Sequence, residues 1–300
     1  MADKKRKGIG YYLVYGTFSL IAMLPFGALY FISDILYGLV YKVVGYRKKV
    51  VRKNLRNSFP EKSKSELMHI EKEFYRHFCD YFVETIKTLR ITDKEIRERM
   101  VFENIDVIDE LTKDGNSCLL SMGHYGNWEW IPSIILHIPE RIKLGMVYKR
   151  LSSKDFDDLF LRIRARFGPK AIEMKSIYRT IVTNRNEGLT MLLGFLNDQR
   201  PRKHANEYWL KFLNQDTLAQ TGMERIASQM GFAVAYLDIV KVKRGYFKCS
   251  VSAITPDASK EDEHFVTDTY TRKLEQTIKN NPAYYLWTHN KWSRTKPTDI

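Results

Sequence analysis

Ser117-Cys-Leu-Leu-Ser-Met-Gly-His-Tyr-Gly-Asn-Trp-Glu-Trp-Ile131 is the stretch of sequence that decides the fold. Its first half is a mainly apolar run, which predicts a buried strand over residues 119–122. The glycines on either side of His124 then predict a tight turn. Asn127 is a residue type that caps helices, so a helix is expected directly after it, with the Glu129 carboxylate in the first turn. The helix dipole favours an ionised carboxylate at that position.

Strands and helices alternate on both sides of this stretch. The other predicted strands cover residues 143–148, 189–196, 232–240 and 246–252. Helices are predicted over residues 128–136, 155–167, 176–184, 222–230 and 268–279. This order predicts an α/β fold with a mixed, mostly parallel central sheet and helices on both faces. The last two strands flank Lys243-Arg-Gly245 and should form an antiparallel hairpin.

Composition and charge restrict the class of protein. The 300 residues are 44% hydrophobic, enough for a large core in one elaborated domain. Lys and Arg number 49 against 35 Asp and Glu, a net charge of +14. That excess indicates an anionic partner: nucleic acid, an acidic membrane surface or a phosphorylated substrate. Cys79, Cys118 and Cys249 form no C-x-x-C pair, so neither a disulfide framework nor a zinc site is indicated.

The N-terminus contains an apolar segment that could bind a membrane. Residues 11–33 carry no charge and are long enough to cross a bilayer or to lie deep in one leaflet. Basic residues flank the segment on both sides, whereas a single crossing usually keeps them on the cytoplasmic side. Pro25 and Gly27 interrupt it, so a broken hairpin or a surface-lying anchor is an alternative. A buried helix of a soluble domain is the third possibility.

From this pattern we divide the chain into an anchor over residues 1–45 and a catalytic α/β domain over residues 46–300. In the second part, Ser63-Lys-Ser-Glu66 is a capping box that opens a long predicted helix.

His124 and Glu129 are the candidate catalytic pair. A carboxylate held against one imidazole nitrogen fixes the tautomer and raises the basicity of the other nitrogen. Such a histidine can take a proton from an alcohol. A histidine that merely caps a helix is the alternative, but the flanking glycines, Trp128, Trp130 and the end of a strand favour catalysis. No third metal ligand lies nearby and no H-E-x-x-H motif occurs, so no metal is expected.

Several sequence blocks together carry a family resemblance. Gly123-His-Tyr-Gly-Asn-Trp-Glu129 resembles the H-x4-[D/E] motif of the lysophospholipid acyltransferase superfamily, in the form found in the late, lauroyl- and myristoyl-type acyltransferases of lipid A biosynthesis. The resemblance extends over most of the chain through further blocks in matching order: Arg52-Lys-Asn-Leu-Arg-Asn-Ser-Phe-Pro60, Val147-Tyr-Lys-Arg150, Asn197-Asp-Gln199, Phe212-Leu-Asn-Gln215 and Trp287-Thr-His-Asn-Lys-Trp292.

The resemblance implies roles for individual residues. His124 would be the general base that deprotonates the acceptor, and Glu129 would orient it and stabilise its charge. The acceptor would attack the thioester of an acyl carrier protein or of coenzyme A, and no prosthetic cofactor is implied. Arg150 matches a block in which a basic residue contacts substrate phosphate, a task that suits a guanidinium group. An ordinary surface arginine is the alternative reading of Arg150.

The block that contains Asp198 departs from the pattern of many relatives. It reads Asn-Asp-Gln-Arg rather than Asp-x-Asp, so the second carboxylate is missing. Asp198 lies at the same sheet edge as His124 if their strands are parallel. We count Asp198, Gln199 and Asn127 among the substrate-binding residues, with a purely structural turn as the alternative for the first two. Glu207 is a second candidate carboxylate partner of the histidine.

Other basic residues could meet an anionic headgroup. Arg200 is the best placed of them, on a loop beside Asp198 that also contains Arg202, Lys203 and His204. The basic residues that end the predicted helix 155–167 complement its dipole, and we interpret them mainly as a solvated face: Arg162, Arg164 and Arg166. Near the C-terminus, His289 and Lys291 alternate with tryptophans, a pattern that suits a membrane interface or a core.

The sequence therefore predicts a membrane-bound acyltransferase that moves a fatty acyl chain from a thioester to a hydroxyl of a phosphorylated glycolipid, a lipid A precursor. The resemblance places it at the bacterial inner membrane with the catalytic domain on the cytoplasmic side. One alternative keeps the enzyme and changes the acceptor to a lysophospholipid or an amino-acid-based lipid. Another is a non-catalytic protein that binds lipid or nucleic acid through its positive charge.

Overall fold

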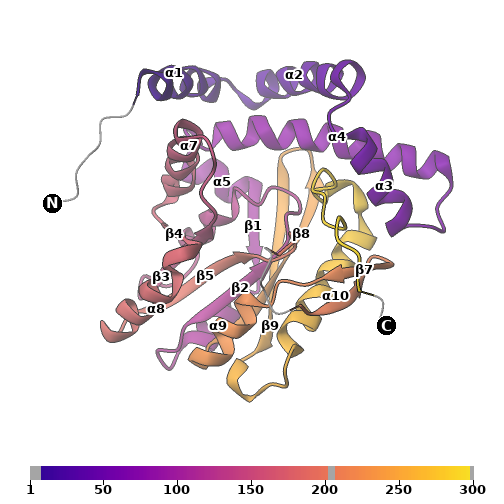
Figure 1. The fold of residues 1–300 in the computed structure, drawn as a ribbon. Helices are drawn as coiled ribbons and strands as arrows, with labels where there is room; N and C mark the ends of the chain where they lie inside the picture. The colour runs from indigo at the N-terminus through magenta and orange to yellow at the C-terminus, as the bar shows by residue number, and fades with distance from the viewer. Residues whose placement is uncertain (1–7, 202–206, 298–300) are drawn as a thin grey trace.

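The computed structural model describes residues 8–201 and 207–297, and a seven-stranded sheet lies at its centre (Figure 1). The strand order is β1-β9-β8-β2-β5-β3-β4. The strands are β1 (Met100–Glu103), β2 (Cys118–Met122), β3 (Ile142–Tyr148), β4 (Lys170–Glu173), β5 (Thr190–Leu196), β8 (Ala233–Lys243) and β9 (Tyr246–Thr255). All neighbours run parallel except β8 and β9, which form the expected antiparallel hairpin. The prediction of an α/β fold with a mostly parallel sheet is confirmed.

Helices surround the sheet along its whole length. After the N-terminal helices, they are α3 (Lys48–Ser58), α4 (Lys64–Lys87), α5 (Asp93–Arg99), α6 (Asp106–Thr112), α7 (Lys154–Arg164), α8 (Ile177–Asn186), α9 (Gly222–Met230) and α10 (Phe265–Asn280). Short 3-10 helices are η2 (Ile131–Leu136), η3 (Ala165–Phe167), η4 (Met174–Ser176), η5 (Ala258–Lys260) and η6 (Pro282–Tyr284). The predicted capping box opens α4, because Ser63 Oγ accepts from the amide of Glu66 at 3.3 Å.

Alternating side chains of the central strands enter two separate hydrophobic clusters. In β2, Leu119 packs into a cluster with residues of α8 and α9, whereas Leu120 and Met122 pack into the larger cluster with residues of α4 and α10. This alternation follows from the two-residue period of a strand. Burial of both sets of side chains therefore explains why β2 is apolar at every position except Ser121.

The short elements at the edges of the sheet were not predicted. β1 and β4 are only four residues long and carry exposed or half-buried positions, so their apolar pattern is weak. The same holds for the hairpin of β6 (Trp209–Phe212) and β7 (Gln215–Leu218), which forms a separate antiparallel sheet.

The predicted helix over residues 128–136 is wrong in type. Residues 128–130 form a turn, and only the 3-10 helix η2 follows. Asn127 does not cap a helix, because its side-chain amide donates to Glu84 Oε2 at 2.8 Å. The tertiary partner on α4 therefore overrides the local capping preference of asparagine.

The N-terminal segment folds into two helices and a π-helical extension. These are α1 (Ile9–Met23), α2 (Phe26–Tyr37) and η1 (Gly38–Val44). The helix is interrupted between α1 and α2, at Leu24 and Pro25. In Figure 1, α1 and α2 lie end to end along the top of the molecule, above α4. Within the described residues, Phe26–Val44 is the one helix long and apolar enough to cross a membrane.

Polar contacts fasten α2 to the body of the protein. Ser33 Oγ donates to Asp80 Oδ1 of α4 at 2.7 Å. Arg244, at the turn between β8 and β9, bonds both Asp80 and Asp34, each at 2.7 Å. The helix is therefore tied to two separate elements of the α/β domain.

Candidate active site

The register of two parallel strands brings His124 and Asp198 together. Met122 at the end of β2 pairs with Leu196 at the end of β5, and each candidate residue lies two positions further along its chain. His124 Nδ1 and Asp198 Oδ1 are 2.6 Å apart. The side chain of Asp198 is 2% exposed and that of His124 is 14% exposed. The carboxylate is thus buried, whereas the imidazole still reaches a surface.

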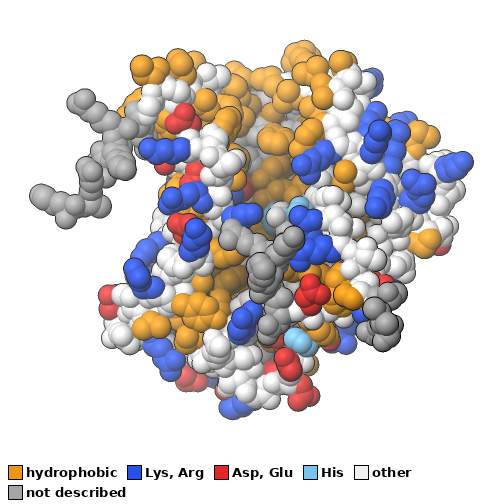
Figure 2. Space-filling model, viewed as in Figure 1, with side chains coloured by type: hydrophobic (Ala, Val, Ile, Leu, Met, Phe, Trp, Pro, Cys, Tyr) orange, Lys and Arg blue, Asp and Glu red, His pale blue; other side chains and the backbone are white. Residues whose placement is uncertain are grey.

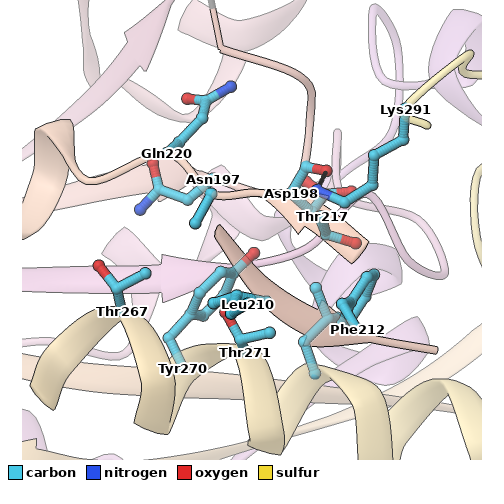
Figure 3. Close-up of a pocket in the computed structure, with 12 residues that line it drawn as sticks. Asn197, Asp198, Leu210, Phe212, Thr217, Gln220, Thr267, Tyr270, Thr271 and Lys291 are labelled. Carbon is cyan, nitrogen blue, oxygen red and sulfur yellow. Dashed lines mark hydrogen bonds between the residues drawn. The ribbon is translucent and has the colours of Figure 1, made fainter. Parts of the chain in front are cut away.

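The surroundings of Asp198 keep it ionised. Burial alone would raise the pKa of this carboxyl group, but the adjacent His124 and the charge of Lys291 lower its pKa to about 2. Lys291 also donates from Nζ to the backbone carbonyl of Asp198 at 2.5 Å, as Figure 3 shows. Burial lowers the pKa of Lys291 to about 8, although Asp198 acts in the opposite direction.

The hydrogen bonds at His124 define which nitrogen is basic. An ionised carboxylate only accepts, so Nδ1 must carry the proton that it donates to Asp198. The other nitrogen, Nε2, is then an acceptor, and the side-chain amide of Gln199 lies 3.2 Å from it. The ring of Trp128 also meets the imidazole edge-on, with centroids 5.2 Å apart. The lone pair of Nε2 therefore accepts a hydrogen bond from the Gln199 amide, and an acceptor hydroxyl has to replace that amide before Nε2 can take its proton.

Glu129 has a different partner from the one predicted. Its carboxylate accepts two hydrogen bonds from the Arg164 guanidinium of α7, at 2.9 and 2.6 Å. The side chains are 4% and 21% exposed. Burial would lower the pKa of Arg164, but the ion pair raises it above its ordinary value. Because residues 128–130 form a turn instead of a helix, the contact expected between Glu129 and Nδ1 of His124 is made by Asp198.

This ion pair also corrects the interpretation of the basic end of α7. Arg164 is not part of a solvated face, because its guanidinium pairs with buried Glu129. Arg166 donates to the carbonyl of Ile91 at 2.8 Å, and Arg162 lies over the ring of Tyr15 at 4.3 Å. All three arginines therefore fasten α7 to neighbouring elements.

The loop that contains His124 is held by the C-terminal segment. The amide of Leu286 donates to the carbonyl of His124 at 3.1 Å, and the amide of Gly126 donates to the carbonyl of Tyr284 at 3.0 Å. Gly126 has a φ of 60°, and a Cβ there would lie 2.8 Å from Ile239. Only glycine fits this close approach without strain.

Below the loop, a buried carboxyl group of α4 contacts Asn127. Glu84 Oε2 accepts from the amide of Asn127, and Glu84 Oε1 accepts from the hydroxyl of Tyr30 in α2 at 3.1 Å. Burial raises the pKa of Glu84 to about 7. The predicted substrate-binding residue Asn127 is therefore buried and connects the loop to α2 through Glu84.

The predicted phosphate-binding arginines lie at exposed positions. Arg150 is 65% exposed, and its guanidinium lies 3.3 Å from the carboxylate of Glu173. Arg200 donates from its backbone amide to Nε2 of His289 at 3.2 Å, and its guanidinium bonds Ser293. Burial lowers the pKa of His289 to about 4, consistent with its acceptor role. The neighbouring Arg202, Lys203 and His204 lie outside the described residues.

The other candidate carboxylate, Glu207, lies on the chain just before β6. It is exposed and accepts a hydrogen bond from the indole of Trp209 at 3.3 Å. The contact to His124 belongs to Asp198, so the geometry decides between the two candidates.

A pocket is lined by Asn197 and Asp198 next to the site. Figure 3 shows Asn197 and Asp198 above it, Tyr270 and two threonines of α10 below it, and Lys291 entering from the C-terminal segment. Its empty space is about 310 Å³. Within the described parts of the chain, no group of three or more His, Cys, Asp or Glu residues is arranged to hold a metal ion.

The space-filling view shows a hollow on the face that is also seen in Figure 1. Figure 2 shows a histidine near the centre of this face, surrounded by basic side chains, with hydrophobic side chains along the upper rim. The upper rim is the position of α1 and α2 in Figure 1, which has the same viewpoint. An α/β sheet with a carboxylate-held histidine at the carboxyl ends of its strands, opening into such a hollow, defines an enzyme that can activate a hydroxyl group.

Comparison with known proteins agrees with this class. The chain matches the family of bacterial lipid A biosynthesis acyltransferases over residues 3–294, nearly its full length, and therefore belongs to that family. The family consists of acyltransferases, and its members are membrane-associated. A search of curated proteins gave no match.

Three contributors to the site were not assigned from the sequence: Arg164, Lys291 and Glu84. A sequence signal existed for Glu84, because it follows Phe74, His77 and Tyr81 at helical spacing on the buried face of α4. A carboxylate on the buried face of a helix needs a hydrogen-bond partner that is also buried. Arg164 had no such signal, since arginine at the end of a helix is ordinary.

Proposed function

We propose that the protein transfers a fatty acyl chain from a thioester to a hydroxyl group of a lipid A precursor, with His124 as general base. The observation that carries the proposal is the hydrogen bond between His124 Nδ1 and ionised Asp198. It leaves Nε2 free to take a proton and stabilises the imidazolium that forms. Family membership supplies the reaction class, a lipid substrate and an acyl donor.

The reaction proceeds in two proton transfers around His124. Nε2 removes the proton of the acceptor hydroxyl as its oxygen attacks the thioester carbonyl. When the tetrahedral intermediate collapses, the carbon–sulfur bond breaks, and the imidazolium returns the proton to the departing sulfur. The products are an ester and a free thiol. The Gln199 amide, 3.2 Å from Nε2, lies close enough to bond the acceptor or the intermediate.

In this proposal, Asp198 takes over the orienting task that the resemblance assigned to Glu129. The bidentate pair of Glu129 and Arg164 instead fixes the turn after His124 against α7. Lys291 supports the same site, because its charge lowers the pKa of Asp198 and its Nζ holds the Asp198 carbonyl. Each of these residues acts on the position or charge of His124.

Positive charge around the hollow suits a phosphorylated acceptor. Figure 2 shows Lys and Arg side chains on both sides of the central histidine. The backbone amide of Arg200 donates to the ring of His289. That ring is close enough to His124 for His124 to influence the pKa of His289. The Arg200 guanidinium is a suitable fork for a phosphate. Arg150 follows the end of β3, which runs parallel to β5, and so lies at the same edge of the sheet as Asp198.

We further propose that α1, α2 and η1 lie in the plane of the bacterial inner membrane on its cytoplasmic side. Their outward positions carry large exposed apolar side chains: Ile9, Tyr12, Leu13, Leu20, Met23, Phe31, Ile35, Leu39, Val43 and Val44. Ser33 on the buried side of α2 bonds Asp80, and the exposed carboxylate of Asp34 bonds Arg244. If α2 crossed the bilayer while docked, these charges would enter the hydrocarbon, at a high cost. An in-plane helix buries only its apolar face.

The proposed function is tested by transfer in vitro. The full chain, purified in detergent, is incubated with acyl carrier protein thioesters or acyl coenzyme A and a panel of lipid acceptors, and products are identified by mass spectrometry. We expect an additional acyl chain on the lipid A precursor and loss of transfer in His124→Ala. Undiminished transfer by that variant would contradict the proposal. A product on a lysophospholipid or an amino-acid-based lipid alone would establish the alternative acceptor.

A further inference from the structure

The carboxyl group of Glu84 in α4 bridges two segments that come from different parts of the chain. One oxygen accepts from the hydroxyl of Tyr30 in α2 at 3.1 Å, and the other accepts from the side-chain amide of Asn127 at 2.8 Å. Tyr30 lies 54 positions from Glu84 in the sequence, and Asn127 lies 43 positions from it. Glu84 therefore links the helix at the top of Figure 1 to the loop that carries His124.

This bridge is retained at a cost in free energy. Glu84 and Asn127 are both fully buried, and a buried carboxyl group is expensive compared with an apolar side chain of similar size. The side-chain oxygen of Asn127 is also buried and has no hydrogen-bond partner within the described parts of the chain. Directional hydrogen bonds specify the relative position of the segments that they join more narrowly than apolar packing does. The bridge is therefore suited to hold the loop in one arrangement.

The position of Asn127 affects the imidazole through the next residue of the chain. Trp128 meets the ring of His124 edge-on with centroids 5.2 Å apart, and its other contact is a stack on Tyr81 of α4 at 4.2 Å. The single hydrogen bond between Nδ1 and Asp198 fixes one atom of the imidazole but not the plane of the ring. Packing against Trp128 restricts that plane. A shift of Asn127 therefore moves the indole and, with it, the direction of Nε2.

A second side chain of α4 holds the residue before Asn127. His77 lies two helical turns before Glu84 on the same face of α4, and its Nε2 is 3.1 Å from the carbonyl of Gly126. Nδ1 of the same ring lies 3.4 Å from Nζ of Lys241. An ammonium group only donates, so Nδ1 accepts and Nε2 donates to the carbonyl. Of these two contacts between α4 and the loop, the one through Glu84 continues to α2.

We propose that Glu84 is a positioning residue of the active site, which makes the orientation of His124 depend on the docking of α2. The inference rests on the proposed function for the role of His124 as the base. Tyr30 reaches Glu84 only while α2 lies on α4, where Ser33 also bonds Asp80 at 2.7 Å. Without α2, Glu84 loses one of its two donors and the loop loses a fixed partner. The helix proposed to contact lipid thus also completes the catalytic geometry.

Two matched variants of α2 test the inference in the full chain. Tyr30→Phe removes only the hydroxyl that bonds Glu84, and Tyr37→Phe removes a hydroxyl from the same helix, where the ring stacks on Tyr41 at 5.3 Å. We expect Tyr30→Phe to lower kcat about tenfold with unchanged KM, the effect of losing one hydrogen bond to a charged group. Tyr37→Phe should keep the kcat of the wild type. An unaltered kcat in Tyr30→Phe, or an equal loss in both variants, would overturn the inference.

Substitutions of Glu84 itself separate the bridge from simple packing. In Glu84→Gln, the carbonyl can accept from Tyr30, and the amide can donate to the unpartnered oxygen of Asn127 once that side-chain amide turns over. Glu84→Met fills the space but bonds neither partner. We expect kcat of Glu84→Gln to stay within about threefold of the wild type and that of Glu84→Met to fall at least about tenfold. Equal losses in the two variants would contradict a bridging role.

The double variant Tyr30→Phe, Glu84→Met should lose no more activity than Glu84→Met alone, because the bridge is already absent. Additive losses would show that the Tyr30 hydroxyl acts by another route and would overturn the inference. Thermal melts fix an assay temperature at which every variant is fully folded, so that a lower kcat does not reflect loss of folded protein.

Hydrogen exchange measures the state of the loop without any substrate. The peptide over residues 123–131 contains the amide of Gly126, which donates to a carbonyl of the C-terminal segment. We expect faster exchange of this peptide in Tyr30→Phe than in the wild type or in Tyr37→Phe. Identical exchange in all three proteins would contradict the inference. If the wild type transferred no acyl chain to any acceptor, the proposed function would fail, while the exchange pattern would still decide whether Glu84 holds the loop.

Discussion

His124 and Asp198 meet because each lies two residues beyond the paired ends of β2 and β5, at Met122 and Leu196. Parallel neighbours present their carboxyl ends at one edge of the sheet, so the hydrogen bond of 2.6 Å joins segments 74 positions apart in the sequence. Both strands lie inside the sheet with neighbours on each side, and nearly all their residues are buried, which gives the histidine and its carboxylate a rigid support.

The Asp198→Asn variant tests the role of this carboxylate. A side-chain amide at this position donates a hydrogen bond to Nδ1, so the imidazole proton moves to Nε2. His124 then has no lone pair at Nε2 with which to act as a base. We expect kcat to fall by roughly 10,000-fold, the effect of the same change in a serine protease triad. The exposed Glu207→Gln is the matched control and should retain full transfer. Thermal melts of both variants show whether the loss of activity is separate from loss of folding.

The sequence predicted the parts of the fold with strong periodicity and missed the parts specified by tertiary contacts. The run Cys118–Met122 is apolar except for Ser121, and the strand predicted over residues 119–122 was placed correctly, as was α9, Gly222–Met230. The turn after His124 was assigned to a helix, because Asn127 is a good cap in isolation. In the folded protein its amide bonds Glu84, which lies 43 positions earlier in the chain. No local pattern contains that contact.

For the site, the sequence identified the histidine, assigned Glu129 as the carboxylate that orients it, and left Asp198 and Glu207 as further candidates. Glu129, Asp198 and Glu207 were all candidates, and separating them requires the strand register and the direction of one turn. The strand register brings Asp198 into contact with His124, and the direction of the turn brings Glu129 into contact with Arg164. Spacing within the H-x4-E motif suggested a contact that depends on the first turn of a helix, and that helix does not form there.

A double-mutant cycle on Glu129 and Arg164 separates a structural role from direct action on His124. Glu129→Met leaves a largely buried guanidinium without its counter-charge, and we expect the free energy of unfolding to fall by about 3 kcal/mol. Glu129→Met with Arg164→Met removes both charges and should recover most of that loss. Denaturation of the single and double variants measures the coupling.

The acyl-transfer activity of the double variant then shows whether Glu129 fixes the turn or orients the imidazole of His124. If Glu129 acts by fixing the turn against α7, recovery of stability brings back most of the transfer. If Glu129 orients the imidazole directly, transfer stays low although the protein is stable again. A coupling energy near zero would show that the ion pair does not stabilise the site.

Lys291 should make stability depend on pH in the alkaline range. Its pKa is about 8 in the folded protein, against an ordinary value of 10.5. Between these values the unfolded chain binds more protons than the folded one, so stability rises with pH, by about 1.4 kcal/mol per pH unit at most. Below pH 8 the cost of burying the charge is fully present. The variant Lys291→Met lacks this dependence.

The measurement is a series of melts of wild type and Lys291→Met from pH 7 to pH 10.5. The difference between the two proteins cancels contributions from other titrating groups. We expect the wild type to gain stability relative to the variant as the pH rises above 8. Parallel curves over the whole range would show that the Lys291 ammonium is not held in a desolvated position.

The orientation of the N-terminal helices can be read from three single cysteines. The native Cys79, Cys118 and Cys249 are all buried, so a membrane-impermeant maleimide does not reach them in the folded protein. Gly8→Cys and Lys49→Cys place an exposed thiol before α1 and after η1, and Met23→Cys places one at the end of α1. Labelling is compared between intact spheroplasts and inside-out vesicles.

Each arrangement of the helices gives a different labelling pattern. For helices in the plane of the cytoplasmic leaflet, Gly8→Cys and Lys49→Cys are labelled only in inside-out vesicles, and Met23→Cys is labelled only after detergent is added, because its side chain lies in lipid. One crossing by Phe26–Val44 would expose Gly8→Cys and Lys49→Cys on opposite faces. Two crossings would expose Met23→Cys in spheroplasts. Only the first pattern is compatible with an α2 that remains bonded to Asp80 and Arg244, since both residues belong to the α/β domain whose site opens beneath this helix.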